Sequence, residues 1–370
     1  MRRHYIDNLR TASIFLLFPY HAAMMFNSFE SFYVYSHSVT VLNAFLIVTW
    51  PWFMPLLFAL AGVSSAYALS RRTAGQYINE RVRKLFIPLL SGVLLLVPMQ
   101  TYYAERFHNG YTGGYLAQYV LFFTKPTDLT GYHGGFTPAQ LWFVLYLFVI
   151  SLLALPLMLW YNKRETKLDA SRLTLPVLIP MCIIPLVMAL IVNIGGKSLG
   201  EYFAYFMLGF LVLSRDEVIE RLRQNRWVLL GLSVLLLGGL YGYYVVSGGS
   251  FAMIPYAILS RAAGWVSVLA LLGGAKQWFN YTGRVPTYLA GASYVVYVFH
   301  QSWLVAAGYY ALQITHNAAA VCGMVVAASI VLSIASYEVV KRLSFTRWLF
   351  GLGGFHKETN PKEIKGEITL

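Results

Sequence analysis

The sequence predicts an all-α integral membrane protein, a bundle of about ten transmembrane helices with both termini in the cytoplasm. Hydrophobic residues make up 58% of its 370 residues and charged residues only 12%, against roughly 25% charged in a soluble domain. At about 20 residues per crossing, this length accommodates about ten spans with short connections. The apolar runs extend over residues 11–29, 43–69, 85–104, 139–161, 174–193, 199–214, 227–246, 252–273, 288–311 and 317–340.

The basic residues are distributed unevenly between the two sides of this predicted bundle. Only Arg106, Lys125 and Lys197 fall in segments expected outside, and Arg261 falls within a run, so the other 24 of the 28 lysines and arginines share one side. This bias identifies that side as the cytoplasm. The net charge of +13 therefore reports orientation in a plasma (inner) membrane, with the lipid bilayer and not nucleic acid as partner.

The chain divides into a transmembrane domain over residues 1–345 and a charged cytoplasmic C-terminal tail over residues 346–370. The first run follows a basic start but is long and lacks a convincing cleavage site, so we interpret it as a retained span. Two cysteines, both inside apolar runs, and scattered histidines support neither a disulfide framework nor a metal site. No metal and no permanently bound cofactor are expected.

The first run carries the most informative polar residue, His21, eleven residues after Arg10. At ~1.5 Å per residue the two side chains are separated by roughly 16 Å along a helix. With Arg10 at the cytoplasmic edge, His21 is expected near the middle of the hydrocarbon core, where an ionisable group is costly and usually functional. Asp7, three residues before Arg10, is expected to orient the guanidinium.

Further polar groups are expected at related depths. His300 lies about as far from the inner edge of its run as His21 does, so the two histidines are expected to share a depth. Arg261 is a third polar group near mid-membrane, and Glu201 lies near the outer end of its run. Packing or counter-charge roles remain open for these residues.

Two loops also stand out. The segment from Glu105 to Pro138 is a long outer loop rich in Gly, Tyr and Phe that contains His133, and its rings suit either sugar stacking or an interfacial aromatic belt. On the cytoplasmic side, Arg81, Arg83 and Lys84 directly precede the third run. Topology alone explains such cations, and a phosphate-rich ligand is the alternative.

An ordered set of segments resembles the acyltransferase 3 family of membrane acyltransferases that modify bacterial surface and extracellular glycans. The residues 5–10 followed by His21 are similar to that family's first-span pattern, and residues 81–84 resemble its Arg-x-x-Arg motif, with Lys84 in place of the second arginine. The other similar segments are 55–62, 141–145, 205–210 and 293–301. The resemblance covers almost the whole chain.

The resemblance implies an O-acyltransferase that moves an acyl group, most commonly acetyl from acetyl-CoA, from the cytoplasm to a hydroxyl of an extracytoplasmic glycan or other envelope acceptor. It implies His21, Arg10 and His300 as catalytic residues. Arg10, Arg81, Arg83 and Lys84 are expected to bind the acyl-CoA donor. Contacts to the transition state or the acceptor are expected from Arg261, Trp142, Glu201 and His133.

Several alternatives stay open at this point. His21 acts either as a general base on the acceptor hydroxyl or as a covalent acyl carrier. A different function, a proton-coupled transporter or exporter of a glycan or lipid precursor, would use His21, Arg261 and His300 as a proton path. The acyl group, the acceptor and a possible homo-oligomer are not defined by the sequence.

Overall fold

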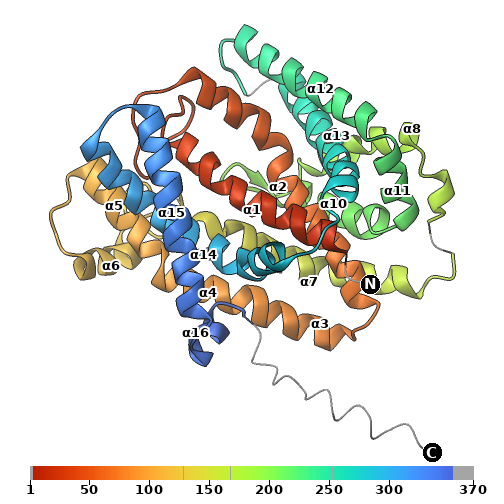
Figure 1. The fold of residues 1–370 in the computed structure, drawn as a ribbon, viewed down its shortest axis with the longest axis horizontal. Helices are drawn as coiled ribbons and strands as arrows, with labels where there is room; N and C mark the ends of the chain where they lie inside the picture. The colour runs from red at the N-terminus through yellow and green to blue at the C-terminus, as the bar shows by residue number, and fades with distance from the viewer. Residues whose placement is uncertain (1–2, 128, 167, 252–253, 353–370) are drawn as a thin grey trace, which may run out of the picture.

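The structure is a computed structural model that describes residues 3–127, 129–166, 168–251 and 254–352. Most of these residues are helical, and long apolar helices form the body of the molecule (Figure 1). The long helices are α1 (His4–Met24), α2 (Thr40–Leu69), α7 (Trp142–Lys163), α12 (Arg226–Val246), α13 (Ile254–Trp278), α14 (Arg284–Ile314) and α15 (Ala318–Val340).

The third predicted run is part of one long, interrupted helical stretch. It consists of α3 (Ala74–Arg81), the π-helical turn η1 (Val82–Phe86), α4 (Ile87–Leu95) and α5 (Val97–Asn109). Thr73 caps its beginning, because its side chain accepts a hydrogen bond from the backbone N–H of Gln76. The break between α4 and α5 precedes Pro98, which has no N–H to continue the hydrogen-bond ladder.

The fifth and sixth runs are shorter and more broken than the others. Three prolines, Pro176, Pro180 and Pro185, divide the fifth into α8 (Leu175–Leu178), η4 (Ile179–Cys182) and α9 (Ile183–Met188). A hairpin of β1 (Asn193–Ile194) and β2 (Lys197–Ser198) turns through Gly195 and Gly196, both with positive φ. The sixth run follows as α10 (Leu199–Leu208) and η5 (Gly209–Leu213). The remaining helices are α6 (Tyr115–Thr124), η2 (Ala139–Leu141), η3 (Ala170–Arg172), α11 (Asp216–Gln224) and α16 (Ser344–Leu349).

Six helical stretches are long and apolar enough to cross a membrane, counted over the described residues. They are Thr40–Leu69, Ala74–Asn109, Ala139–Lys163, Arg226–Val246, Ile254–Trp278 and Ala318–Val340. The prediction of about ten spans and the cytoplasmic side of the termini are therefore not confirmed. The fifth and sixth runs fall short in length, whereas α1 and α14 are long but carry more polar residues.

The two long helices that are less apolar, α1 and α14, each pack against several other helices. Helix α1 packs against α2, α13, α14 and α15, and α14 packs against α1, α5 and α15 (Figure 1). Buried side chains cover most of the middle of α14, including Ser293, His300, Gln301 and Ser302. Protein neighbours therefore surround the polar groups in the middle of α14.

The long loop and the tail are both partly folded onto the bundle. Helix α5 continues to Asn109, and Glu105 accepts hydrogen bonds from Lys125 Nζ at 2.7 Å and Asn109 Nδ2 at 2.8 Å, which fixes the loop containing α6. In the predicted tail, α16 is followed by Phe350, whose ring lies 4.8 Å from that of Phe299. The tail from residue 353 onward lies outside the described residues.

Candidate active site

Helices α1 and α14 bring the two predicted histidines together. The ring centroids of His21 and His300 are 5.3 Å apart, with 34° between the ring planes. His21 lies in the last turn of α1, because that helix ends at Met24 and not at residue 29 as the apolar run predicts. His300 lies in the middle of the much longer α14.

The protonation of His300 follows from its backbone partner. Its Nδ1 lies 2.5 Å from the carbonyl oxygen of Tyr297, and a carbonyl can only accept, so Nδ1 carries the proton. In the neutral ring Nε2 is then an unprotonated acceptor. This atom is buried and has no hydrogen-bond partner among the described residues, and the same holds for Nδ1 of His21. Unsatisfied buried polar atoms are uncommon in proteins, and a catalytic role is one explanation for them.

Buried amides hold the segment of α14 around His300. Gln140 donates from Nε2 to the carbonyl of Val298 at 2.9 Å and accepts from Tyr297 OH on its own carbonyl. Gln100 of α5 donates from Nε2 to Ser302 Oγ at 2.8 Å. These bonds tie α14 to α5 and η2 immediately on both sides of His300, so the imidazole is held by a rigid surrounding.

Aromatic rings enclose the histidine pair. Phe32 stacks on His21 with centroids 6.0 Å apart and only 12° between planes, and Phe18 meets His300 edge-on at 5.7 Å. The ring of Tyr132 packs in turn on Phe32, so the loop 105–138 reaches the cover of the pair. Apolar rings exclude water and strengthen polar interactions made inside.

His133 does not touch the histidine pair. Its ring lies 5.7 Å from that of His108, and His108 Nε2 is 2.9 Å from the carbonyl of Phe32. His133 is therefore linked to the cover of His21 through His108 and through its sequence neighbour Tyr132, both of which contact Phe32. Its expected contact to an acceptor stays a prediction.

At the other end of α1, two of the predicted donor-binding arginines lie on adjacent serines of α2. Arg10 donates from Nη2 to Ser64 Oγ at 2.7 Å, and Arg81 donates from Nη2 to Ser65 Oγ at 3.1 Å. Arg10 also donates from Nη1 to Asp7 Oδ1 at 3.2 Å. Two guanidinium groups are thus anchored on consecutive residues of one helix, and each carries the charged N–H donors that bind phosphate.

Tyr77 completes this arginine site. The Arg81 guanidinium lies 4.5 Å over the Tyr77 ring, and Tyr77 OH is 3.0 Å from Ser65 Oγ. A stacked guanidinium with a hydroxyl partner is held in one orientation. Arg83 and Lys84 are not part of this arrangement, because they line a different pocket together with α16.

Arg261 of α13 and Glu201 of α10 form an ion pair. Arg261 Nη2 is 2.9 Å from Glu201 Oε2, and the two side chains are 26% and 15% exposed. Trp142 contacts Tyr202, the residue that follows Glu201, and their ring centroids are 5.5 Å apart. Lys197 Nζ lies 5.2 Å over the Trp142 ring, and partial burial lowers the pKa of Lys197.

Replacing Glu201 by glutamine is expected to destabilise the fold, because Arg261 would remain half-buried without its counter-charge. Breaking a fully buried pair costs roughly 3–5 kcal/mol, and the partial exposure here reduces our expectation to about 2 kcal/mol. Thermal unfolding of the purified protein measures the loss. The double variant Glu201→Gln with Arg261→Gln should recover part of it, and additive losses would contradict the pairing.

The sequence did not point to Ser64, Ser65, Tyr77 or Phe32. The two serines were visible as a polar pair directly after residues 55–62, near the end of an otherwise apolar run. That signal alone does not reveal their arginine partners. Among the described residues, no group of three or more His, Cys, Asp or Glu could hold a metal ion.

These features define a helical multi-pass membrane protein in which a histidine at one end of the first helix meets a buried histidine of α14, and two serine-anchored arginines lie toward the other end of that helix. The chain matches the acyltransferase domain family, Acyl_transf_3, over residues 3–337 and belongs to that family. No curated protein and no solved structure gives a match. The matched range contains both sites, and the family indicates a membrane acyltransferase.

Proposed function

We propose that this acyltransferase moves an acyl group, most commonly acetyl, from a cytoplasmic acyl-CoA to a hydroxyl of an extracytoplasmic glycan or other envelope acceptor. The observation that carries the proposal is the histidine pair, whose rings lie 5.3 Å apart with unpartnered buried nitrogens among the described residues. An imidazole is the side chain best suited to take a proton at neutral pH.

The reaction that we propose begins with His21 as the general base. His21 takes the proton of the acceptor hydroxyl while the hydroxyl oxygen attacks the thioester carbonyl carbon. The carbon–sulfur bond breaks, the acyl group remains as an ester on the acceptor, and the thiolate of CoA leaves and receives the proton from the imidazolium. His300 assists as a second proton acceptor. Its unprotonated Nε2 has no hydrogen-bond partner among the described residues.

Arg10 and Arg81 are our proposed ligands for the donor's phosphates. Their anchoring to Ser64 and Ser65 supports this role, because preorganised guanidinium groups bind phosphate bidentately. Along α1, Arg10 and His21 are separated by roughly 16 Å at ~1.5 Å per residue. An extended donor held by its charged end at Arg10 would thus have its thioester end toward the histidines. Asp7 orients Arg10 in this scheme.

The experiment that tests the function uses the purified full chain in liposomes with labelled acetyl-CoA and cell-envelope glycans. We expect release of free CoA that depends on the glycan, with the label recovered as an alkali-labile ester. Label that accumulates on the enzyme when the glycan is omitted would favour a covalent acyl-histidine. Movement of a glycan or lipid precursor across the bilayer without acyl chemistry would overturn the proposal.

Replacing Arg81 by lysine is expected to raise KM for acyl-CoA by roughly tenfold with a smaller change in kcat. Lysine keeps the charge but loses the stacking on Tyr77 and the planar fork that donates to Ser65. Steady-state kinetics with varied acyl-CoA measures the effect. Arg71→Lys is the matched control, because Arg71 is exposed and belongs to neither site. Equal KM values in both variants would contradict donor binding at Arg81.

A further inference from the structure

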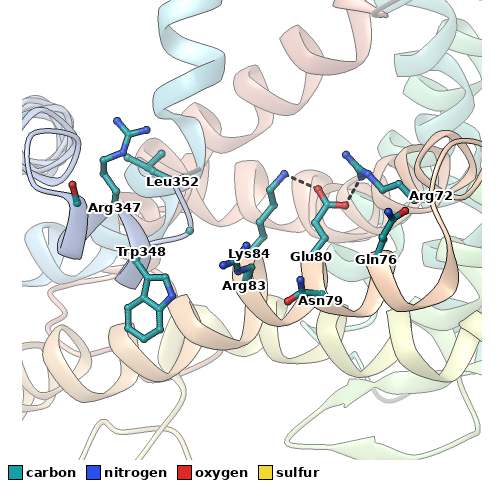
Figure 2. A pocket seen from close by; sticks show the side chains of 11 residues that line it. Arg72, Gln76, Asn79, Glu80, Arg83, Lys84, Arg347, Trp348 and Leu352 are labelled. Carbon is teal, nitrogen blue, oxygen red and sulfur yellow. Dashed lines mark hydrogen bonds and ion pairs between the residues drawn. The ribbon is translucent and has the colours of Figure 1, made fainter. Parts of the chain in front are cut away.

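A basic pocket of about 520 Å³ lies between the α3–η1 stretch and α16, and the proposed reaction does not use it. Its charged lining consists of Arg72, Glu80, Arg83 and Lys84 from one side and Arg347 from α16. Figure 2 shows Glu80 of α3 between Arg72, from the bend before α3, and Lys84 of η1, with Trp348 of α16 on the facing side. Among the described residues, four cations and one carboxylate line this space.

The carboxylate neutralises only part of this charge. Glu80 accepts from Lys84 Nζ at 2.6 Å and also pairs with Arg72 (Figure 2). Arg83 is exposed and has no hydrogen bond or ion pair to any residue that the structure describes. Arg83 is therefore the cation best placed to meet an anion that enters the pocket.

The pocket is distinct from the arginine site proposed for the donor. Tyr77 and Arg81 of α3 contact Ser65 of α2, whereas Glu80 of α3 and Arg83 of η1 line the pocket. Arg10 and Arg81 do not line it. A ligand in the pocket would thus be held separately from one bound at Ser64 and Ser65.

Exposed apolar side chains of α16 lie at and beside the pocket. Trp348, which lines the pocket, is 49% exposed, and Phe345, whose ring lies 6.3 Å from that of Trp348, is 67% exposed. Leu343, directly before α16, is 58% exposed. Exposed aromatic and aliphatic side chains beside lysines and arginines are typical of the membrane–water interface. A phosphate group attached to acyl chains would match both parts, with its charge among the cations and its chains against these apolar side chains.

We propose that this pocket binds the phosphate diester of an anionic phospholipid headgroup. The phosphate binds Arg83 and the acyl chains lie against Trp348, so the lipid joins α16 to the α3–η1 stretch that also carries Arg81. The affinity depends on ionic strength, because exposed charges are screened within about 8–10 Å at physiological salt.

The test measures binding of a short-chain phosphatidylglycerol to the purified full chain, with phosphatidylcholine of the same chain length as reference. We expect phosphatidylglycerol to bind more tightly, and Arg83→Gln to weaken it roughly fivefold, the effect of about one cation near an anionic surface. Arg71→Gln is the matched control, since Arg71 is a neighbouring exposed arginine outside the pocket. It should bind like the wild type.

A second variant gives a result that misfolding cannot imitate. Glu80→Gln removes the only carboxylate that lines the pocket in the described structure and releases Lys84 and Arg72, so it should bind phosphatidylglycerol more tightly than the wild type. Phosphatidylglycerol binding that is indifferent to both Arg83→Gln and Glu80→Gln would overturn the proposal. Displacement of the lipid by adenosine 3′,5′-bisphosphate would also overturn it, because the pocket would then hold the nucleotide end of the donor. Neither measurement involves acyl transfer, so the outcome is independent of the proposed function.

Discussion

His21→Ala is expected to lower kcat for acyl transfer by about 10²–10⁴-fold while the protein remains expressed and folded. This is the usual loss when a positioned general base is removed. His21 is only half-buried at the end of α1, and its contacts are to rings, so alanine leaves no buried charge behind. Initial rates with saturating acyl-CoA and glycan measure the effect, and melting temperature reports the fold.

The matched control is His316→Ala, because His316 is an exposed histidine that follows the end of α14. It should transfer acyl groups at the wild-type rate. A His21→Ala enzyme with more than about a tenth of wild-type kcat would rule out His21 as the base, since general-base catalysis contributes at least about 10²-fold.

The second histidine makes the same experiment more specific. If His21 and His300 act in one step, the double variant should lose little more activity than either single variant, because residues that act as a unit are not additive. Multiplied losses would instead indicate separate tasks, such as acid–base chemistry at one ring and binding at the other. His300→Gln is the suitable single variant, since a polar amide of similar reach can still meet the carbonyl of Tyr297.

The sequence predicted the histidine pair but not its neighbours. Spacing along two helices placed His21 and His300 at one depth, and their rings are 5.3 Å apart. Spacing could not reveal that Phe32, from the segment after α1, covers His21. Such contacts depend on the path of irregular backbone, for which the chain carries no periodic signal.

In the basic segment 81–84, the sequence grouped residues that the structure separates. Arg81, Arg83 and Lys84 are nearly consecutive in sequence, and their shared charge grouped them as one site. In a helix, successive side chains point about 100° apart, so Arg81 meets Ser65 while Arg83 and Lys84 line the pocket against α16. The sequence shows which residues are charged, but the direction of each side chain depends on its position around the helix. The π-helical turn η1 changes that position further.

The predicted helices are present, whereas the predicted number of spans is not confirmed. Each of the ten apolar runs contains helix, but three prolines shorten the fifth and polar residues interrupt the apolarity of α1 and α14. Length and composition describe each helix by itself and contain no information about its neighbours. The interior of a bundle shelters polar helices that would not be stable in lipid by themselves.

Gly62→Ala is expected to destabilise the protein strongly, because α2 and the α10–η5 stretch touch backbone to backbone at this position. A Cβ on Gly62 would lie 1.9 Å from the carbonyl oxygen of Phe206, and one on Gly209 would lie 2.1 Å from that of Ala59. These obstacles are backbone atoms that cannot rotate away, so the helices must separate. We expect a loss of at least about 1–3 kcal/mol, the usual cost of overpacking.

The control has the opposite expected sign. Gly231→Ala in α12 adds a methyl group where nothing lies within 4 Å, and alanine favours a helix interior by up to about 1 kcal/mol over glycine. Thermal unfolding of the two variants, purified in the same detergent, should therefore shift in opposite directions. Similar shifts in both would show that α2 and α10 do not meet as closely as described.

Close packing at Gly62 also affects the position of the proposed donor site. Ser64 and Ser65, which anchor Arg10 and Arg81, follow Gly62 on the same helix by two and three residues. A methyl group that moves α2 away from α10 must move these serines relative to α1 and α3. Gly62→Ala should therefore raise KM for acyl-CoA even below its unfolding temperature, whereas Gly231→Ala should leave KM unchanged. A destabilised Gly62→Ala enzyme with wild-type KM would separate the packing role of this glycine from the position of the arginines.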